Sequence, residues 1–212
     1  MKLDLYVVTD EGLSRGLTHA EIARRAVLGG ADAVQLREKT KPAREILAAA
    51  REIRSITASY GRLFLVNDRL DIAISSGADG VHLGQDDLPL REARRRVPED
   101  FIIGISVGSP EEAILAEEGG ADYVALSPVF PTLSKPDAGP GSGLQTLWEI
   151  RARVSIPLIA IGGITTGNVQ DVIRSGADGV AVISAVVSQD DIASAARNMK
   201  SLVSAAKKDR NL

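Results

Sequence analysis

Four copies of one phrase decide the fold of this chain: GGADAVQLR at 29–37, SGADGVHLG at 76–84, GGADYVALS at 119–127 and SGADGVAVI at 175–183. Each copy has the pattern of a helix end, a turn and a buried strand. The glycine before each Ala-Asp pair suits the left-handed position that closes a helix, where a Cβ would clash. The apolar run that follows is too short for a helix and too continuous for a half-exposed strand. The four glycines are Gly30, Gly77, Gly120 and Gly176.

Four further apolar runs lie between the copies, at 5–8, 63–66, 101–105 and 157–161. With helical patterns in the gaps, the chain predicts eight alternating strands and helices. We expect one α/β domain over residues 1–212, a (βα)8 TIM barrel near the lower size limit of that fold. A doubly wound open sheet is the competing fold. It would show one crevice, whereas polar residues follow nearly every strand here, which favours a ring.

Local signals place several helices. Thr18 to Glu21 has the capping-box pattern, and Ser109-Pro110 offers a cap followed by a proline at the first helical position. Ile46, Ala50 and Ile53 follow helical spacing. Residues 207–212 are polar, and we expect them to fray.

Composition excludes several functions. The net charge of −3 argues against a nucleic-acid surface, and the absence of cysteine excludes disulfides and thiolate chemistry. No apolar run reaches membrane length and no signal peptide is found, so we expect no membrane partner and a cytoplasmic location. A homo-oligomer is compatible with the sequence.

The second strand continues into charged residues. Because strand side chains alternate, Gln35, Arg37 and Lys39 are expected on one face, where an amide and two cations would meet. Solvated charges at a strand end are the simpler interpretation. An anion site is favoured, since a guanidinium within an apolar strand is costly without an anion.

Two carboxylates follow the third and fourth strands. Asp68 comes after Asn67, and Asp87 follows the strand that holds His82. Paired carboxylates suit a hard cation, and Mg²⁺ is the natural candidate beside a phosphate. Alternatively, Asp86 or Asp87 caps the helix that begins near Pro89. For His82 we expect a hydrogen-bonded interior position.

The segment at 128–143 holds four of the nine prolines and predicts a long, mobile loop that closes over substrates. Thr132, Ser134 and Lys135 favour a functional loop. Gly162 and Gly163 after the seventh strand, with Ser184 after the eighth, suggest the phosphate site that TIM barrels place there.

These residues form no Ser–His–Asp set and offer no obvious general base. The expected ligands are a diphosphate and a separate monophosphate. Such a site would act by stabilising a departing pyrophosphate with metal and cations.

The motifs QLREK (35–39), VNDR (66–69), GVHLGQDDLP (80–89), PVFPTLSK (128–135) and IAIGGI (159–164), in this order, resemble the thiamine phosphate synthase family, also called thiamine-phosphate pyrophosphorylase. The resemblance implies a transferase that couples 4-amino-5-hydroxymethyl-2-methylpyrimidine diphosphate to 4-methyl-5-(2-hydroxyethyl)thiazole phosphate. Thiamine phosphate and pyrophosphate would form by a dissociative, Mg²⁺-assisted mechanism.

The same resemblance assigns residues to roles. It implies that the pyrimidine diphosphate contacts Gln35, Leu36, Arg37, Glu38, Lys39, Asn67, Ser106 and Lys135. Asp68 and Asp87 would bind Mg²⁺. The thiazole phosphate would contact Thr132, Leu133, Ser134, Gly163, Ile183 and Ser184. Arg37, Lys39, Ser106 and Lys135 would assist catalysis.

Two positions depart from the family pattern. Ser134 stands where a threonine is common, and Gly108 where a histidine is common. A related thiazole tautomerase, which uses a histidine base near that position, is therefore one alternative. A non-catalytic paralogue that only holds thiazole or thiamine phosphate is another, but it would be expected to lose Lys135 or the paired aspartates.

Overall fold

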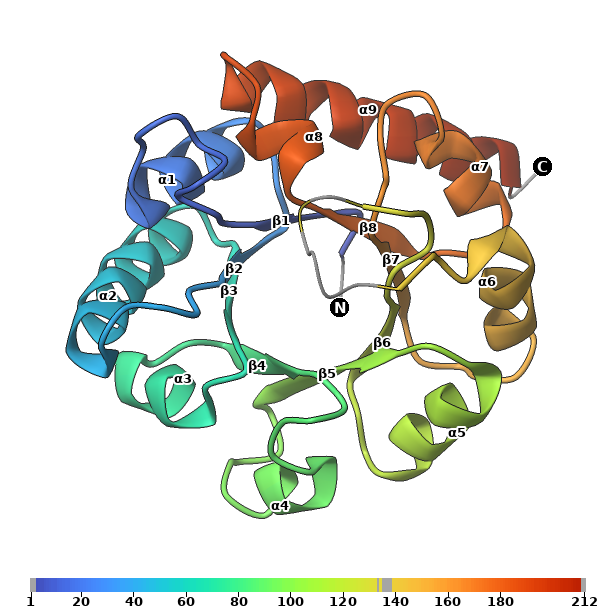
Figure 1. The fold of residues 1–212 in the computed structure, drawn as a ribbon, viewed down its shortest axis with the longest axis horizontal. Helices are drawn as coiled ribbons and strands as arrows, with labels where there is room; N and C mark the ends of the chain where they lie inside the picture. Colours follow the sequence, from blue (N-terminus) through green and yellow to red (C-terminus); the bar gives the residue numbers. More distant parts are fainter. Residues whose placement is uncertain (1–2, 133, 135–138, 211–212) are drawn as a thin grey trace.

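A computed structural model describes residues 3–132, 134 and 139–210. Its strands form a closed parallel barrel in which each strand pairs with the next strand in the sequence. β1 pairs with β8 and closes the ring (Figure 1). This confirms the TIM barrel and excludes the open sheet. The strands are β1 (Leu5–Val8), β2 (Ala33–Leu36), β3 (Leu63–Asn67), β4 (Gly80–Leu83), β5 (Ile102–Val107), β6 (Tyr123–Leu126), β7 (Leu158–Ile161) and β8 (Gly179–Val182).

Helices surround the barrel and cover its outer surface (Figure 1). They are α1 (His19–Leu28), α2 (Ala43–Ser59), α3 (Leu70–Ser76), α4 (Leu90–Arg94), α5 (Pro110–Glu118), α6 (Gly143–Arg151), α7 (Val169–Arg174), α8 (Ser184–Val187) and α9 (Ile192–Arg210). The last helix, α9, packs against both α7 and α1 and so joins the end of the chain to its beginning. Within the described residues, no helix is both long and apolar enough to span a bilayer.

The local predictions for helix ends are confirmed. Thr18 forms the capping box with Glu21, and Ser109 caps α5 ahead of Pro110. The repeat glycines have φ values of 94° at Gly30, 69° at Gly77, 87° at Gly120 and 112° at Gly176. These left-handed positions explain why glycine recurs in every copy.

The aspartate of the repeated phrase has a structural role that the sequence did not reveal. In each copy its carboxylate accepts a hydrogen bond from a backbone N–H in the first two residues of the neighbouring strand. The four bonds join Asp32 to Leu5 (3.0 Å), Asp79 to Phe64 (2.8 Å), Asp122 to Ile103 (2.7 Å) and Asp178 to Leu158 (2.9 Å). Each carboxylate also pairs with a basic side chain, such as Arg54 at Asp79. The repeat therefore fixes the amino-terminal end of the barrel, opposite the face where TIM barrels hold their chemistry.

The expectation of a frayed carboxyl end is wrong for residues 207–210. Helix α9 continues to Arg210, whose guanidinium donates to the carbonyls of Ile173 (3.1 Å) and Ala177 (2.9 Å). Lys207 pairs with the buried Asp4. These contacts tie the helix end to the barrel, which polarity alone could not show.

Candidate functional site

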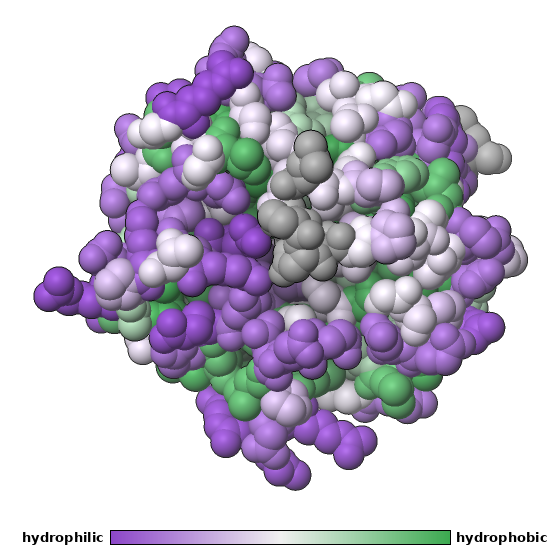
Figure 2. All heavy atoms as spheres, viewed as in Figure 1, coloured by the Kyte–Doolittle hydropathy of each residue, from purple (hydrophilic) through white to green (hydrophobic). Residues whose placement is uncertain are grey.

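Most of the predicted site residues meet at the carboxyl ends of the strands, in two separate places. One is a cleft of about 210 Å³ past β2 to β5. It is lined by Arg37, Lys39, Asn67, Asp68, His82, Gly84, Gln85, Asp86, Asp87 and Ser106. Figure 2 shows that hydrophilic side chains dominate this part of the face. The cleft thus brings together residues that are up to 69 positions apart, the span from Arg37 to Ser106.

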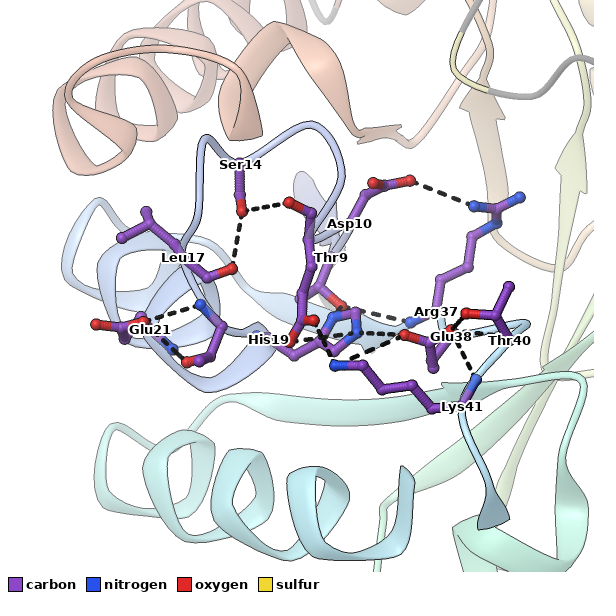
Figure 3. Close-up of polar contacts among 12 residues, drawn as sticks. Thr9, Asp10, Ser14, Leu17, His19, Glu21, Arg37, Glu38, Thr40 and Lys41 are labelled. Atoms are coloured by element: carbon purple, nitrogen blue, oxygen red, sulfur yellow. Dashed lines mark hydrogen bonds and ion pairs between the residues drawn. The ribbon is translucent and has the colours of Figure 1, made fainter. Parts of the chain in front are cut away.

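Arg37 has a carboxylate partner that the sequence analysis missed. It lies one residue beyond β2 and not inside the strand, and its side chain is 13% exposed. Its guanidinium is 3.4 Å from Oδ2 of Asp10, which follows β1 (Figure 3). The expectation that Arg37 lies within the apolar strand is therefore wrong, and Asp10 already supplies a counter-charge from within the protein. Asp10 neutralises part of the charge and fixes the direction of the side chain, while Arg37 still lines the cleft.

Glu38 organises the turn that carries Arg37 and Lys39. Its Oε1 accepts hydrogen bonds from the N–H (2.7 Å) and hydroxyl (2.8 Å) of Thr40 and from the N–H of Lys41 (3.3 Å). Its Oε2 is 3.3 Å from Nε2 of His19 (Figure 3). Burial alone would raise the pKa of Glu38, but these hydrogen bonds outweigh it and lower the pKa to about 2. Glu38 therefore acts on the site by shaping the turn.

Beneath this turn, Glu11, His19 and Glu38 place one ligand atom each within 4.8 Å of one another. Such a group could bind a metal, but Lys41 pairs with both Glu11 and Glu38 and already supplies the cation. Figure 3 shows Lys41 beside Glu38 and His19. Nδ1 of His19 is also engaged, 2.7 Å from the hydroxyl of Thr9. We therefore interpret this group as structural support for the turn.

The paired aspartates share the cleft and fit a hard cation. Asp68 has a left-handed backbone (φ 63°) just past β3, and its Oδ2 is 3.9 Å from Nζ of Lys39. Oδ2 of Asp87 accepts the N–H of Gly84 at 2.7 Å, which holds the carboxylate at the cleft. Each carboxylate has two oxygens and can accept more than one partner. Two carboxylates with the Asn67 amide nearby are an oxygen-rich set of the kind that Mg²⁺ prefers.

The alternative role for the acidic pair, as a helix cap, is wrong. Helix α4 has Pro89 at its N-cap position and no side-chain cap. The carboxylate of Asp87 instead bonds back to Gly84.

The second place is a pocket between the ends of β6, β7 and β8. Its lining includes Thr132, Ser134, Gly162, Gly163, Ile183 and Ser184. The segment after β6 runs beside the end of β7, because Val129 donates to the carbonyl of Ile161 (2.9 Å) and Phe130 to that of Gly162 (3.1 Å). This close approach requires glycine: a Cβ on Gly163 would lie 2.6 Å from Cβ of Phe130.

Some predicted contacts are not brought to either place as side chains. Leu36 is 1% exposed and belongs to the core, and Gln35 is 4% exposed with its amide turned into the barrel. Leu133 and Lys135 lie outside the described residues, as do 136–138 of the predicted mobile loop. His82 is a hydrogen-bonded interior histidine, as predicted.

Four residues of the site were not predicted from the sequence: Thr9, Asp10, His19 and Lys41. The only sequence signal was the polar pair Thr9-Asp10 directly after the first apolar run. It resembles the polar ends of the other strands and could have been read in the same way.

The fold and the site define this protein as a TIM-barrel enzyme. Its (βα)8 barrel is closed, and polar side chains gather at the carboxyl ends of the strands. The sequence profile of a family described as "Thiamine monophosphate synthase" matches residues 5–186. The chain belongs to this family, and it is a transferase of thiamine biosynthesis.

Individual relatives agree with this assignment. The chain is 62% identical over 207 residues to "Thiamine-phosphate synthase" of Methanoculleus marisnigri, covering 98% of each chain. It is 59% identical over 204 residues to the protein of the same name from Methanocella arvoryzae, covering 96% of each. Among solved structures, it matches "Thiamine phosphate pyrophosphorylase" of Pyrococcus furiosus with a TM-score of 0.90 and 43% identity, covering 96% of each chain.

Proposed function

We propose that this transferase joins 4-amino-5-hydroxymethyl-2-methylpyrimidine diphosphate to 4-methyl-5-(2-hydroxyethyl)thiazole phosphate and releases pyrophosphate. The observation that carries the proposal is the cleft past β2 to β5, where Arg37 and Lys39 meet Asp68 and Asp87. Cations and carboxylates in one cleft suit a diphosphate that shares a metal with the protein. The phosphate pocket past β6 to β8 would hold the second substrate.

In this proposal, the residues of the cleft bind the diphosphate. Arg37 and Lys39 supply positive charge, while Asn67 and Ser106 supply polar contacts. Asp10 and Glu38 act indirectly, since they hold Arg37 and the turn around it. Gln35 and Leu36 would contribute through the main chain or by shaping the pocket wall, because their side chains are buried.

Asp68 and Asp87 would hold Mg²⁺, with Asn67 beside them. Bound there, the ion would neutralise charge on the departing pyrophosphate. Oδ2 of Asp68 lies 3.9 Å from Nζ of Lys39, so a basic side chain already stands beside the proposed metal site.

The thiazole phosphate would bind in the pocket lined by Gly163, Ile183 and Ser184, with Thr132 and Ser134 facing it from the segment after β6. On the family resemblance alone, we assign Leu133 to thiazole phosphate binding and Lys135 to the diphosphate. Lys135 would approach the diphosphate and assist its departure.

The chemistry is charge stabilisation. The bond between the pyrimidine methylene carbon and the diphosphate oxygen breaks, and its electron pair leaves with pyrophosphate. The lone pair of the thiazole nitrogen then forms the new carbon–nitrogen bond to the resulting cation. This nitrogen has no proton to lose, so the step needs no general base. That agrees with a cleft whose predicted diphosphate contacts are cations, an amide and a hydroxyl.

Phosphorylated substrates do not cross membranes unaided, so we place the reaction in the cytoplasm. The cleft and the pocket are formed within one chain, so the proposal requires no second subunit.

The direct test mixes both phosphorylated precursors with the purified protein and Mg²⁺. We expect thiamine phosphate and pyrophosphate in a ratio of one to one, and loss of both products when EDTA removes the metal. Binding of thiazole phosphate without any product would instead favour the non-catalytic paralogue.

A tautomerase assay on the isomeric thiazole phosphate covers the other alternative. We expect no activity, because Gly108 stands at the common histidine position and offers no side chain that could act as a base. Efficient isomerisation without coupling would overturn the proposal.

A further inference from the structure

A chain of hydrogen bonds crosses the interior of the barrel and ends at the cleft. Nε2 of Gln35 donates to Oη of Tyr6 at 2.7 Å, and this hydroxyl is 3.3 Å from Oη of Tyr123. Oη of Tyr123 is 2.9 Å from Nδ1 of His82, and Nε2 of His82 is 2.9 Å from Oγ of Ser106. The chain thus links five strands and reaches a residue that lines the cleft.

The middle of this chain is closed to solvent and closely packed. Tyr6 is 1% exposed, Tyr123 is fully buried and His82 is 7% exposed. Burial raises the pKa of both tyrosines, so they are neutral hydroxyls. The ring of Tyr123 stacks on that of His82 with centroids 5.6 Å apart.

Gly104 makes this stacking possible. In the barrel register, Gly104 lies between His82 on β4 and Tyr123 on β6. A Cβ on Gly104 would lie 2.0 Å from Cζ of Tyr123. The glycine therefore lets the tyrosine ring cross β5 and reach the histidine.

One direction of the chain gives every buried proton an acceptor; in the reverse direction the hydroxyl proton of Tyr6 would have none among these residues. Tyr6 accepts the N–H of Gln35, so its one hydroxyl proton is directed to Tyr123. Tyr123 accepts that bond, and its own proton is directed to Nδ1 of His82. His82 is then the neutral tautomer with its proton on Nε2, and this N–H donates to Oγ of Ser106. Ser106 accepts from the interior, so its own hydroxyl proton is left for the cleft.

We propose that His82 is a positioning residue, set in one tautomer by Tyr6 and Tyr123, that makes the hydroxyl of Ser106 a hydrogen-bond donor toward the cleft. The last step, donation to the diphosphate, rests on the proposed function. The tautomer of His82, and the hydrogen bonds that set it, do not depend on the proposed function. Gln85 supports the same arrangement, since its amide donates to the carbonyl of Ser106 at 2.6 Å.

The first test measures the tautomer in the free protein. The chain contains two histidines, so ¹⁵N-labelled imidazole gives two sets of signals, and a His19→Gln variant assigns them. We expect the His82 proton on Nε2 in the wild-type protein and a mixture of tautomers in Tyr123→Phe. A proton on Nδ1 in the wild-type protein would overturn the proposal, because Ser106 would then donate inward.

The second test measures coupling. Tyr123→Phe should lower kcat about tenfold with a smaller change in KM for the pyrimidine diphosphate, since the Ser106 bond strengthens as pyrophosphate gains charge. In a Ser106→Ala background, Tyr123→Phe should lower kcat less than twofold. Tyr60→Phe is the matched control, because Tyr60 is exposed at the end of α2. Equal losses in both backgrounds would assign Tyr123 a purely structural role and overturn the proposal.

Tyr6→Phe replaces this test if Tyr123→Phe does not fold. The Tyr6 variant removes the hydroxyl that orients Tyr123 and leaves the ring of Tyr123 stacked on His82. It should release the tautomer in the same way, and an unchanged His82 signal would overturn the proposal. If the wild-type protein forms no product, the proposed function fails, while the tautomer measurement still decides the role of His82.

Discussion

Oγ of Ser134 lies 3.2 Å from Oγ of Ser184, although 50 residues separate them in the chain. One serine follows β6, and the other begins α8, with one residue between it and the end of β8. The two hydroxyls meet at the pocket that also contains Gly163. A phosphate placed there could accept from both hydroxyls, which makes this pair the most direct test of the second substrate site.

We expect Ser184→Ala to raise KM for thiazole phosphate about tenfold, because one hydrogen bond to a charged group contributes about 1.5–3 kcal/mol. KM for the pyrimidine diphosphate should change less than twofold. Steady-state kinetics with each substrate varied in turn measures both values. Ser201→Ala, on the exposed side of α9, is the control. An equal rise in both KM values would contradict the assignment of this pocket.

Gly163 offers a test that separates crowding from backbone strain. It has φ 64°, and a Cβ would meet Phe130 and, at 2.7 Å, the carbonyl oxygen of Pro131. Gly61 has φ 60° with nothing within 4 Å of a Cβ. Both Gly→Ala variants should lose about 1–2 kcal/mol of unfolding free energy from the left-handed backbone. Gly163→Ala should lose more than Gly61→Ala, because its Cβ also meets the backbone at Pro131. Gly163→Ala should also weaken thiazole phosphate binding at least tenfold, as measured by calorimetry.

An unchanged affinity in Gly163→Ala would show that the close approach of Phe130 to β7 does not shape the pocket. Weaker binding in Gly61→Ala would show that lost stability alone explains the effect.

The fold could be predicted from the sequence because its evidence is local and repeated. A glycine at 30, 77, 120 and 176 needs only the geometry of one turn, and each turn is followed by a short run of buried residues. The aspartates of the same phrase could not be understood in this way. Their partners lie on neighbouring strands, such as Phe64 for Asp79, and strand pairing is known only once the barrel closes.

The cleft was predicted in part for a similar reason. Arg37, Lys39, Asp68 and Asp87 follow strands, so topology alone brings them to one rim. The pairing of Arg37 with Asp10 and the support of Glu38 by His19 depend on side-chain directions in the segment after β1 and at the start of α1. Periodicity carries no information about such a segment. The interior chain from Gln35 to Ser106 was missed because it depends on how side chains from five strands meet.

Asp87→Asn tests the metal assignment with little change in shape. An asparagine oxygen can still accept the N–H of Gly84, so the loop should keep its position while the site loses one negative charge. We expect the Mg²⁺ concentration for half-maximal rate to rise at least tenfold, with kcat lowered. Asp100→Asn, at an exposed turn, is the control. An unchanged Mg²⁺ titration would remove Asp87 from the metal site.

The lowered pKa of Glu38 predicts that the stability of the protein depends on pH in the acid range. Its pKa is about 2 in the folded protein, below the ordinary value of 4.5. The ionised form is therefore favoured by folding, so its contribution is complete above pH 4.5 and is lost as the pH falls toward 2. Glu38→Gln should be less stable than the wild-type protein at pH 7, by about 1–3 kcal/mol, because a buried network loses a charged acceptor.

The difference between the two proteins should shrink as the pH falls from 4.5 toward 2, since the wild-type carboxylate becomes protonated in that range. Urea unfolding at a series of pH values measures it directly. Glu99→Gln, at an exposed position, should follow the wild-type curve at every pH. A constant gap for Glu38→Gln would mean that the carboxylate contributes through packing and not through its charge. The turn at Arg37 and Lys39 would then be held mainly by the remaining contacts of Lys41 and Asp10.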